Sequence, residues 1–404
     1  MRPIILCISS SYPKSPGDPN GVFVHELNKE LLPYSEPIVI SPLFKGGAKE
    51  EYIDNIKIYR HKQFIFNNIQ LAYGTDILVK LRNNFLYYFV VPFFLTYQLF
   101  LIKKVIKRKD IKIIHAYWII PGAFLAAVYK RYFNNDIKIV ATLLGADIWS
   151  FNKGWKRNLL KFTFKYIDIV TSQSLQLGQE LSELGYKGKL FHYPIGIDVT
   201  KFSPKKIDIN IKERFNIKGK MLLFVGSLIE RKGIKYLISS MPFVVENFPE
   251  TKLIIIGSGD LQESMLKLTQ DLNIAEHIIF TGNILNHDLP PYFATADIFI
   301  LPSLSEGFPL VVMEALSSGT ISIVSDLPVF KSLDNDKQFL ITIEKRNITK
   351  LAKAIVQVLS QKEVFIKSKI EARNYALENF NIKKSAVSYS SVYQSLLNHT
   401  RSNK

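Results

Sequence analysis

Two glutamates eight residues apart are the first candidates for a functional site, because their spacing would place one carboxylate before a predicted helix and the other within it. Glu306 and Glu314 lie within the segment Ile298–Gly319, IFILPSLSEGFPLVVMEALSSG. An apolar strand is predicted over Ile298–Leu301, and it leads into a loop that contains Glu306. A helix is predicted from about Pro309, because proline suits the first helical turn, where its missing N–H costs nothing. One carboxylate therefore precedes the helix and the other lies within it.

The predicted start of this helix is a candidate anion site, because backbone N–H groups around Phe308 and Leu310 have no partner within the helix. Pro309 contributes no N–H group. A carboxylate beside a bound phosphate would be repelled unless it accepted hydrogen bonds from sugar hydroxyls. A nucleotide sugar offers both phosphate and hydroxyls, so the pattern favours that ligand. The alternative is that Glu306 is a solvated loop residue and Glu314 a surface charge on the helix.

The elements that would position these residues alternate between short apolar runs and longer amphipathic stretches, which is typical of parallel α/β architecture. The runs are continuous rather than alternating, as in strands that are buried on both faces. Strands are expected at Pro3–Ser9, Glu36–Ile40, Ile111–Ala116, Ile137–Thr142, Ile167–Thr171, Lys189–Tyr193, Met221–Val225, Lys252–Ile256, His277–Thr281, Ile298–Leu301 and Ile321–Val324.

The chain has 404 residues, above the size of about 250–300 residues at which a single hydrophobic core stops growing. The polar, lysine-rich stretch Lys201–Lys220 is the best linker candidate. We therefore expect two doubly wound Rossmann-like domains, residues 1–203 and 204–382, facing each other across a cleft at the carboxyl ends of their strands. A final amphipathic helix is expected over about 383–404. Its spacing does not indicate where it docks, and the first domain is one candidate.

The charge is strongly basic: 52 Lys and Arg against 35 Asp and Glu give a formal net charge of +17. Residues 1–203 hold 27 basic and 15 acidic residues, a net of +12, so most of the excess lies in the first half. That asymmetry suggests an anionic partner for the first domain. The single cysteine, Cys7, cannot form an internal disulfide, so disulfide scaffolds are excluded and a reducing compartment is expected.

Two basic stretches of the first half, Lys103–Lys112 and Lys153–Lys165, contain or adjoin aromatic residues. Such faces suit an anionic membrane surface, although solvated helix faces would look similar. Between Phe85 and Ile102 the chain is nearly uncharged, which fits a buried core helix, an interfacial helix or a membrane span. No signal peptide is expected, because Pro3–Ser9 is short and is followed at once by a proline-rich loop. No nucleic-acid-binding module accompanies the charge.

The segment around the two glutamates resembles the E-x7-E signature of the family-4 glycosyltransferases, which are retaining enzymes of the two-domain GT-B fold. Other stretches resemble this family in the same order along nearly the whole chain. They are NGV (20–22), IIHAYWIIPG (113–122), TLLGAD (142–147), YPIGIDVTKFSP (193–204), FVGSLIERKG (224–233), LIIIGSGD (253–260) and FTGNI (280–284).

The resemblance implies a role for each matching residue. Glu314 would hold the ribose hydroxyls, and Glu306 would contact the donor sugar near its anomeric carbon. Lys232 and Arg231 would neutralise the leaving diphosphate. Asp147 would contact the acceptor or the donor sugar and is counted, with Glu306, Lys232 and Arg231, as a catalytic candidate. The remaining donor-site candidates are Gly21, Ser227, Gly282, Asn283, Ile284, Gly307, Phe308, Pro309 and Leu310.

The first domain departs from the family pattern at its acceptor side. Tyr117 and Leu144 stand where the family often has histidine, which puts a histidine-assisted step in doubt. His115 and Tyr117 are the remaining acceptor-side candidates. In the second domain, Ser227 occupies a position that is often arginine, so Arg231 would be the second cation of the clamp. Ile195 replaces a common asparagine, and no consequence follows from the sequence.

The resemblance implies a retaining, hexosyltransferase-like enzyme that moves a sugar from a UDP- or GDP-linked donor to an acceptor hydroxyl in cell-surface polysaccharide or glycolipid synthesis. We expect a glycan or lipid-linked acceptor, no cofactor and no metal, with Asp334-Asn335-Asp336 as solvated surface. The expected location is cytoplasmic, peripheral on the cytoplasmic face of the membrane. The alternatives are a nucleotide-sugar epimerase of the same fold and a non-catalytic nucleotide-sugar-binding or membrane-scaffolding protein.

Overall fold

The computed structural model describes residues 2–66, 69–73, 77–145, 148, 150–307, 309–331 and 339–401. The chain forms two compact units, each with its own sheet and hydrophobic core. Unit 1 comprises residues 1–195 together with 382–404, and unit 2 comprises residues 196–381. The prediction of two doubly wound α/β domains is confirmed.

Unit 1 is built on an eight-stranded sheet with the order β3-β4-β2-β1-β5-β6-β7-β8. Every pairing is parallel except the one between β3 and β4. Its strands are β1 (Ile4–Ile8), β2 (Glu36–Pro42), β3 (Glu50–Ile53), β4 (Ile56–His61), β5 (Ile113–Tyr117), β6 (Lys138–Leu143), β7 (Ile169–Ser172) and β8 (Lys189–His192).

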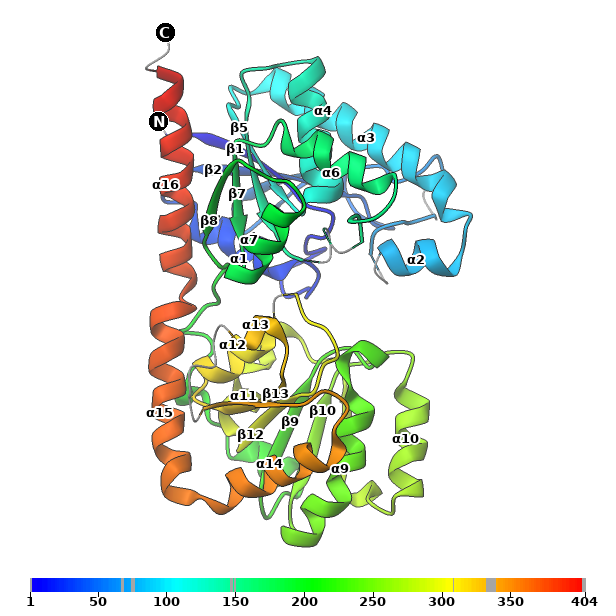
Figure 1. The fold of residues 1–404 in the computed structure, drawn as a ribbon, viewed down its shortest axis with the longest axis vertical. Coiled ribbons are helices and arrows are strands. Elements are labelled where there is room, and N and C mark those ends of the chain that lie inside the picture. The colour runs from blue at the N-terminus through cyan, green and yellow to red at the C-terminus, as the bar shows by residue number, and fades with distance from the viewer. Residues whose placement is uncertain are drawn as a thin grey trace. The chain divides into compact units, whose positions relative to one another are not determined.

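Helices cover both faces of this sheet (Figure 1). On one face α3, α4 and α6 pack over the apolar strand residues, and on the other α1 contacts α16. The continuous apolar runs of the central strands follow from this double burial. The helices of unit 1 are α1 (Val22–Glu30), α2 (Ile77–Asn83), α3 (Tyr87–Arg108), α4 (Phe124–Tyr132), α6 (Lys156–Phe164), α7 (Leu175–Glu183) and α16 (Ile382–Arg401), and a π-helical turn, η1 (Ile119–Ala123), precedes α4.

The hairpin formed by β3 and β4 escaped sequence analysis. Its strands carry charged residues, and β3 is the edge strand with β4 next to it, so they lack the long apolar runs of the central strands. The turn consists of Asp54 and Asn55, which both have positive φ angles, 47° and 64°. Two consecutive residues with positive φ are typical of the tight turns that join antiparallel strands. The Asp-Asn pair was the signal that could have revealed this hairpin.

The apolar run between Phe85 and Ile102 forms most of α3, which has one buried and one exposed face. Val90, Phe94 and Ile102 are buried on the side toward β2, β4 and α4. The helix is long and apolar enough to cross a membrane by length and composition, and one third of its most apolar window is buried in the protein. One such helix is weak evidence for a membrane span, because a core helix of a soluble protein passes the same test.

Unit 2 contains a six-stranded sheet of order β11-β10-β9-β12-β13-β14, with every pairing parallel. The strands are β9 (Met221–Val225), β10 (Lys252–Ile256), β11 (Ile278–Gly282), β12 (Ile298–Leu301), β13 (Ile321–Ser325) and β14 (Leu340–Ile343). The helices are α8 (Asn210–Arg214), α9 (Ile234–Asn247), α10 (Gln262–Asp271), α11 (Pro290–Thr295), α12 (Leu310–Ser317), α13 (Pro328–Lys331), α14 (Ile348–Ser360) and α15 (Lys362–Asn379).

The units meet along the chain at residues 195/196 and 381/382, whereas sequence analysis placed the first boundary at 203/204. Val199 and Phe202 belong to the core of unit 2. Arg373 of α15 holds this segment by donating to the carbonyl oxygens of Val199 and Phe202, at 2.8 and 2.9 Å. The segment before Pro204 therefore packs with the second unit, although its composition resembles an interdomain linker.

Candidate functional site

In the unit 2 sheet the direction in which successive strands are added reverses at β9, which lies between β10 and β12 (Figure 1). The chain runs outward from β9 to β10 and β11, and then starts again on the other side at β12. The loops that follow β9 and β12 therefore separate at the carboxyl edge of the sheet, which is where ligands bind in open α/β sheets. Glu306 follows β12, and Arg231 and Lys232 follow β9, so the chain places opposite charges at this point.

The carboxylate of Glu306 is buried, with a side chain only 5% exposed, and is held from both loops. Lys232 Nζ lies 2.7 Å from its Oε1, and Arg231 Nη1 lies 3.4 Å from its Oε2. The hydroxyl of Ser303 donates to Oε1 at 2.6 Å. Arg231 also donates to the carbonyl oxygen of Ser305 at 3.0 Å. A buried carboxylate is tolerated because it is both paired and hydrogen-bonded.

The close approach of the two loops depends on Gly233, which follows Lys232. Its φ angle is 68°, and a Cβ atom there would lie 1.9 Å from the carbonyl oxygen of Pro302. Only glycine combines that backbone conformation with that contact. The backbone N–H of Leu304 donates to the carbonyl oxygen of Arg231 at 2.8 Å, which ties the loops together. Gly233 therefore fixes where Lys232 can reach.

The helix that carries Glu314 begins one residue later than predicted. Pro309 is the N-cap residue of α12, and the helix spans Leu310–Ser317. At its other end Gly319 has a φ angle of 70°. Its N–H donates to Leu316 O at 3.0 Å, and the N–H of Thr320 donates to Ala315 O at 2.9 Å. These two bonds form a Schellman motif, so the predicted stop at Gly319 is confirmed.

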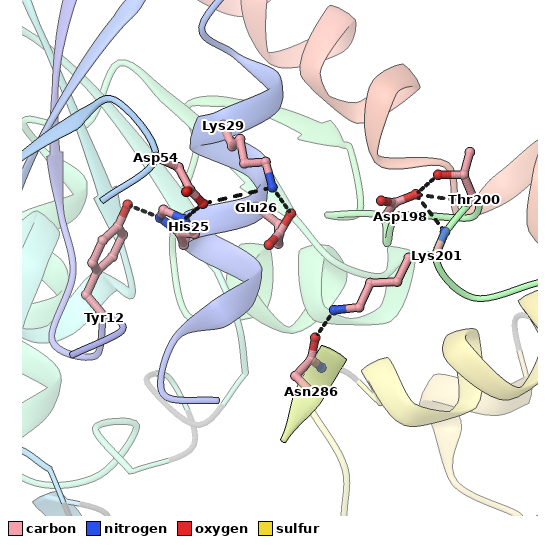
Figure 2. A network of polar contacts seen from close by, with 9 residues as sticks. All are labelled: Tyr12, His25, Glu26, Lys29, Asp54, Asp198, Thr200, Lys201 and Asn286. Carbon is pink, nitrogen blue, oxygen red and sulfur yellow. Dashed lines mark hydrogen bonds and ion pairs between the residues drawn. The ribbon is translucent and has the colours of Figure 1, made fainter. Parts of the chain in front are cut away.

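Glu314 lies almost fully buried on α12, and burial raises the pKa of its carboxyl to about 7, while the Lys201 charge and a hydrogen bond with Asn286 act in the opposite direction. Lys201 Nζ also donates to the side-chain oxygen of Asn286 (Figure 2). The carboxyl is thus poised between its neutral and charged forms near neutral pH. A group in this state can accept hydrogen bonds from ligand hydroxyls when it is ionised.

Asp198 anchors the backbone from which Lys201 extends (Figure 2). Its Oδ1 accepts hydrogen bonds from the N–H groups of Thr200 and Lys201, at 2.8 and 3.1 Å, and from the Thr200 hydroxyl at 2.6 Å. Partial burial raises the pKa of Asp198, but these hydrogen bonds outweigh it and hold the pKa below its usual value. The ionised Asp198 therefore fixes the turn that directs Lys201 toward Asn286.

The other expected donor-site residues lie on loops at the same edge of the sheet. Ser227 follows β9 and is exposed, and Gly307 follows β12 and is partly exposed. Gly282 ends β11, and its carbonyl oxygen accepts from the N–H of Gly257 at 2.8 Å. Asn283 donates to the hydroxyl of Ser258 at 2.8 Å. Ile284 packs against the core of unit 2, and so does Leu310 at the first position of α12.

Three predicted features lie outside the described residues. Asp147, the acceptor-side carboxylate, is one of them, and Phe308 before α12 is another. The third is the Asp334-Asn335-Asp336 string, which lies in the undescribed residues 332–338. Within the ranges given above, no group of three or more His, Cys, Asp or Glu side chains is arranged to hold a metal ion.

In unit 1, the loop after β1 ends at Gly21, the N-cap residue of α1. Its φ angle is 63°, and a Cβ atom would lie 2.2 Å from the carbonyl oxygen of Ser11. Within this region Tyr12 OH lies 2.8 Å from His25 Nδ1, and His25 Nε2 lies 2.9 Å from Asp54 Oδ2 (Figure 2). The loop is therefore held through α1 to the β3–β4 turn. Gly21 is required there by backbone conformation and by close contact.

Arg60 on β4 fixes the same loop from inside the protein. It donates to the carbonyl oxygen of Pro13 at 2.6 Å and to the Tyr73 hydroxyl at 2.8 Å. The Tyr73 hydroxyl in turn donates to the carbonyl oxygen of Tyr12 at 3.1 Å. The arginine is almost fully buried, and it also pairs with Glu51. Sequence analysis missed this clamp because β4 was not recognised as a strand.

His115 and Tyr117, the acceptor-side candidates, are fully buried in unit 1. His115 contacts the hydroxyl of Tyr393 on α16 through Nδ1 and that of Thr142 through Nε2, both at 2.7 Å. Burial lowers the pKa of His115 to about 3, so the ring is neutral. Tyr117 packs beside it and donates to Asn28 at 3.4 Å. These side chains join the sheet to α16 and α1.

Comparison with known proteins follows the same division of the chain. The family described as "Glycosyl transferases group 1" matches residues 205–377, and the family described as "Glycosyl transferase 4-like" matches residues 69–174. The first match contains every charged residue of the unit 2 site except Lys201 and Asp198. Together the two matches span more than half of the chain.

Two relatives and one solved structure illustrate the similarity. UDP-Gal:alpha-D-GlcNAc-diphosphoundecaprenol alpha-1,3-galactosyltransferase of Escherichia coli is 30% identical over 57% of this chain and 62% of its own length. GDP-mannose-dependent alpha-(1-6)-phosphatidylinositol monomannoside mannosyltransferase of Mycolicibacterium smegmatis is 25% identical over 69% of this chain and 75% of its own. Sucrose-phosphate synthase of Thermosynechococcus elongatus superposes with a TM-score of 0.81 at 18% identity, covering 98% and 100% of the two chains.

The fold and the matched regions define a two-domain glycosyltransferase of the GT-B type. Residues 205–377 are similar to the group 1 glycosyl transferases, and residues 69–174 to the 4-like glycosyl transferases. The expected family resemblance is therefore confirmed.

Lys201, Asn286 and Ser303 are the contacts of the two glutamates that sequence analysis did not single out. Lys201 was assigned to a linker because its neighbours are polar and weakly periodic. Asn286 follows the predicted base-contacting loop by two residues, and Ser303 precedes Glu306 by three. Proximity in sequence to a motif was the available signal for Asn286 and Ser303. Lys201 lies within the family-like segment 193–204, but more than one hundred residues separate it from Glu314, and spacing alone does not bring the two together.

Proposed function

We propose that this protein transfers a sugar from a nucleoside diphosphate sugar to an acceptor hydroxyl with retention of anomeric configuration. The observation that carries the proposal is the charge arrangement at the carboxyl edge of the unit 2 sheet. Two cations, Lys232 and Arg231, converge on the buried carboxylate of Glu306 at the point where the strand order changes direction. A diphosphate needs the cations, and a sugar ring offers hydroxyls to the carboxylate.

In the proposed reaction the bond between the anomeric carbon and the diphosphate oxygen breaks, and the acceptor oxygen forms the new bond to that carbon. The acceptor proton passes to the leaving phosphate oxygen. Lys232 has three donors on its ammonium group and uses one for Glu306, so others are free to neutralise the charge that develops on the leaving group. Arg231 is half exposed and can reach the same phosphates.

Glu314 is the proposed acceptor of hydrogen bonds from the ribose hydroxyls, and Glu306 that of the donor sugar. Around them, the backbone of Gly307, Phe308 and Leu310 is proposed to hold the sugar and the diphosphate, with Pro309 as the N-cap residue. Ser227 and Gly21 approach the phosphates in this proposal. Gly282, Asn283 and Ile284 contact the base. Asp147 is proposed as the remaining contact to acceptor or sugar. No metal and no cofactor are required by this set of charges.

The proposed acceptor is a growing glycan on a lipid carrier at the cytoplasmic face of a membrane, in cell-surface polysaccharide or glycolipid synthesis. Both relatives described above carry lipid-linked acceptors in their names. In unit 1, the exposed face of α3 presents Phe89 and Phe100, and its last turns present Lys104 and Lys107. Aromatic residues beside cations suit the interface of an anionic membrane.

A panel of UDP-, GDP-, ADP- and dTDP-sugars, tested by thermal shift with EDTA present, examines the donor proposal. Stabilisation by one nucleotide class in wild type, absent from Glu314→Ala, is the expected result. The anomeric configuration of the product, read by NMR, then tests retention. A folded protein that no donor stabilises, with or without acceptor and vesicles, would contradict a donor site in unit 2.

The membrane proposal has its own test, co-sedimentation with vesicles that contain anionic or only zwitterionic lipids. Binding to anionic vesicles should weaken as salt rises through the physiological range, because exposed charges are screened. The variant Lys104→Glu/Lys107→Glu should bind less, and Lys345→Glu, an exposed position of unit 2, should bind as wild type. Equal binding by all three proteins would refute a role for α3.

A further inference from the structure

A cavity of about 270 Å³ opens in unit 1 between the loops that follow β2 and β4. Its apolar lining includes Phe44, Phe64 and Ile69, and Lys45 and Lys62 also line it. Because β2 and β4 are parallel neighbours, both loops lie at the carboxyl edge of the sheet, together with the loop after β1. Ligands of open α/β sheets bind at that edge. None of the matched motifs accounts for this cavity.

The walls of the cavity are fixed by contacts from behind. The guanidinium of Arg60 lies 4.9 Å from the centre of the Phe44 ring. Phe64 packs edge to face against Phe93 of α3, with ring centres 5.0 Å apart. The side chain of Gln63 joins the two loops, because it donates to the carbonyl oxygen of Leu43 at 2.7 Å. The cavity is therefore formed before any ligand binds.

The charges around the cavity are all positive. Lys45 and Lys62 are exposed, and none of the described residues that line the cavity is acidic. Within the part of the chain that the structure describes, neither lysine takes part in an ion pair. Two unpaired ammonium groups beside an apolar lining suit a ligand with phosphate at one end and hydrocarbon at the other.

The apolar surface continues from the cavity onto α3. Phe93, which packs against Phe64, is itself 38% exposed, and Phe89 one turn earlier is 66% exposed. The cavity is slightly smaller than the roughly 300–1,000 Å³ of sites that enclose a whole small molecule. It can therefore hold only the chain segment next to the phosphates, and the exposed rings of α3 offer a path for the rest.

We propose that this cavity binds the lipid diphosphate that carries the acceptor sugar. The first part of the hydrocarbon chain lies among Phe44, Phe64 and Ile69, and Lys45 and Lys62 bind the phosphates. The inference deepens the proposed function and rests on it, since it names where the carrier of the acceptor is held. It assigns a specificity site to a part of unit 1 that no motif marks.

Calorimetric titration with farnesyl diphosphate tests the proposal on the full chain. Saturating nucleoside diphosphate is present, so that the cations of the donor site are occupied. Wild type should bind the probe at least about tenfold more tightly than inorganic pyrophosphate, because a few buried methylene groups account for that factor. Ile69→Trp, which fills the cavity, and Lys45→Glu/Lys62→Glu should each weaken binding by about tenfold or more.

Matched controls are Leu175→Trp and Lys187→Glu, which change exposed positions of the same unit. Both should bind the probe as wild type does. The lysine variants alter only exposed side chains, so they remain informative if Ile69→Trp fails to fold. Unchanged binding by the lysine variants, or equal binding of pyrophosphate, would overturn the proposal.

The two proposals fail in different ways. If farnesyl diphosphate binds through the cavity but no nucleotide sugar binds unit 2, the proposed function fails while a lipid site remains. If nucleotide binding is intact and the probe is lost only in Lys232→Met, the probe occupies the donor cations and the cavity proposal fails. Nucleotide affinity should be the same in every cavity variant.

Discussion

Because the carboxyl of Glu314 is buried, we predict that Glu314→Gln is more stable than wild type but binds donor only weakly. Glu314→Gln keeps the shape of the side chain and removes its charge. Burial raises the pKa of Glu314 from 4.5 to about 7. A folded-state pKa above the unfolded value means that the folded protein holds the proton more tightly. The contribution of Glu314 to the free energy of unfolding is therefore fully present below about pH 4.5 and is lost as the pH rises through about 7.

The magnitude follows from the difference between the two pKa values. At 1.36 kcal/mol per pKa unit, ionisation of Glu314 costs the folded protein about 3 kcal/mol at pH 8. At pH 5 the titration of Glu314 lowers the stability of the folded protein by only about 1 kcal/mol, because most of the folded molecules keep the proton. Glu314→Gln avoids this cost. Its advantage over wild type should therefore grow by about 2 kcal/mol between pH 5 and pH 8.

Urea denaturation of both proteins at the two pH values measures this difference, with a fluorescence signal that follows the loss of unit 2. Donor affinity, measured by titration with the nucleotide sugar, should rise through pH 7 in wild type as Glu314 ionises. It should be weak and independent of pH in Glu314→Gln. A stability difference that is the same at pH 5 and pH 8 would refute the assignment of Glu314 as a buried, titrating carboxyl.

Lys201→Met provides the matched test of the neighbouring charge. The ammonium group of Lys201 holds the pKa of Glu314 down against the effect of burial. Its removal should shift the pH dependence of donor binding to higher pH, with no loss of binding at the highest pH. An unchanged profile would show that the two groups do not interact in solution.

Two further substitutions test the packing that positions these groups. Gly233→Ala should lower stability by at least about 1–2 kcal/mol, the cost of a left-handed backbone for alanine, and should also lose activity because its Cβ would meet the carbonyl of Pro302. Gly154→Ala, at φ 60° in open space, should show the backbone cost without loss of activity. Tyr393→Phe should lower the free energy of unfolding by about 1–3 kcal/mol because it leaves His115 without one partner, and nucleotide affinity should stay unchanged. An unaltered unfolding midpoint would contradict that contact.

The sheets were predictable because their central strands are buried on both faces and carry continuous apolar runs. The strands that escaped prediction are β3, β4 and β14, which lie at or near sheet edges. The apolar side of the final helix was also predictable, since Tyr389 and Tyr393 are buried as its period requires. The docking of this helix on unit 1 was not predictable, because the spacing of apolar residues identifies the buried face of a helix but not the surface against which it packs.

The site was predictable only in part. The approach of Lys232 to Glu306 could be predicted, because both residues lie in family-like segments that directly follow parallel strands, and the loops after such strands lie at the same carboxyl edge of the sheet. The contact of Lys201 with Asn286 joins distant parts of the chain, and sequence spacing carries no such information. His115 lies in the middle of β5, and its ring points into the interior toward α16. A shift of one residue along a strand decides whether a side chain enters the core or faces a ligand, and the packing around the strand sets that position.

The most direct test of the central claim compares Glu306→Gln with wild type in two assays, binding of the free nucleoside diphosphate and sugar transfer. The substitution keeps the side-chain shape next to Lys232 and Ser303 and removes the charge near the proposed anomeric position. We predict that the variant folds, retains binding of the free nucleoside diphosphate within about tenfold, and transfers sugar at least about a hundredfold more slowly. A variant that transfers sugar at the wild-type rate would contradict the account.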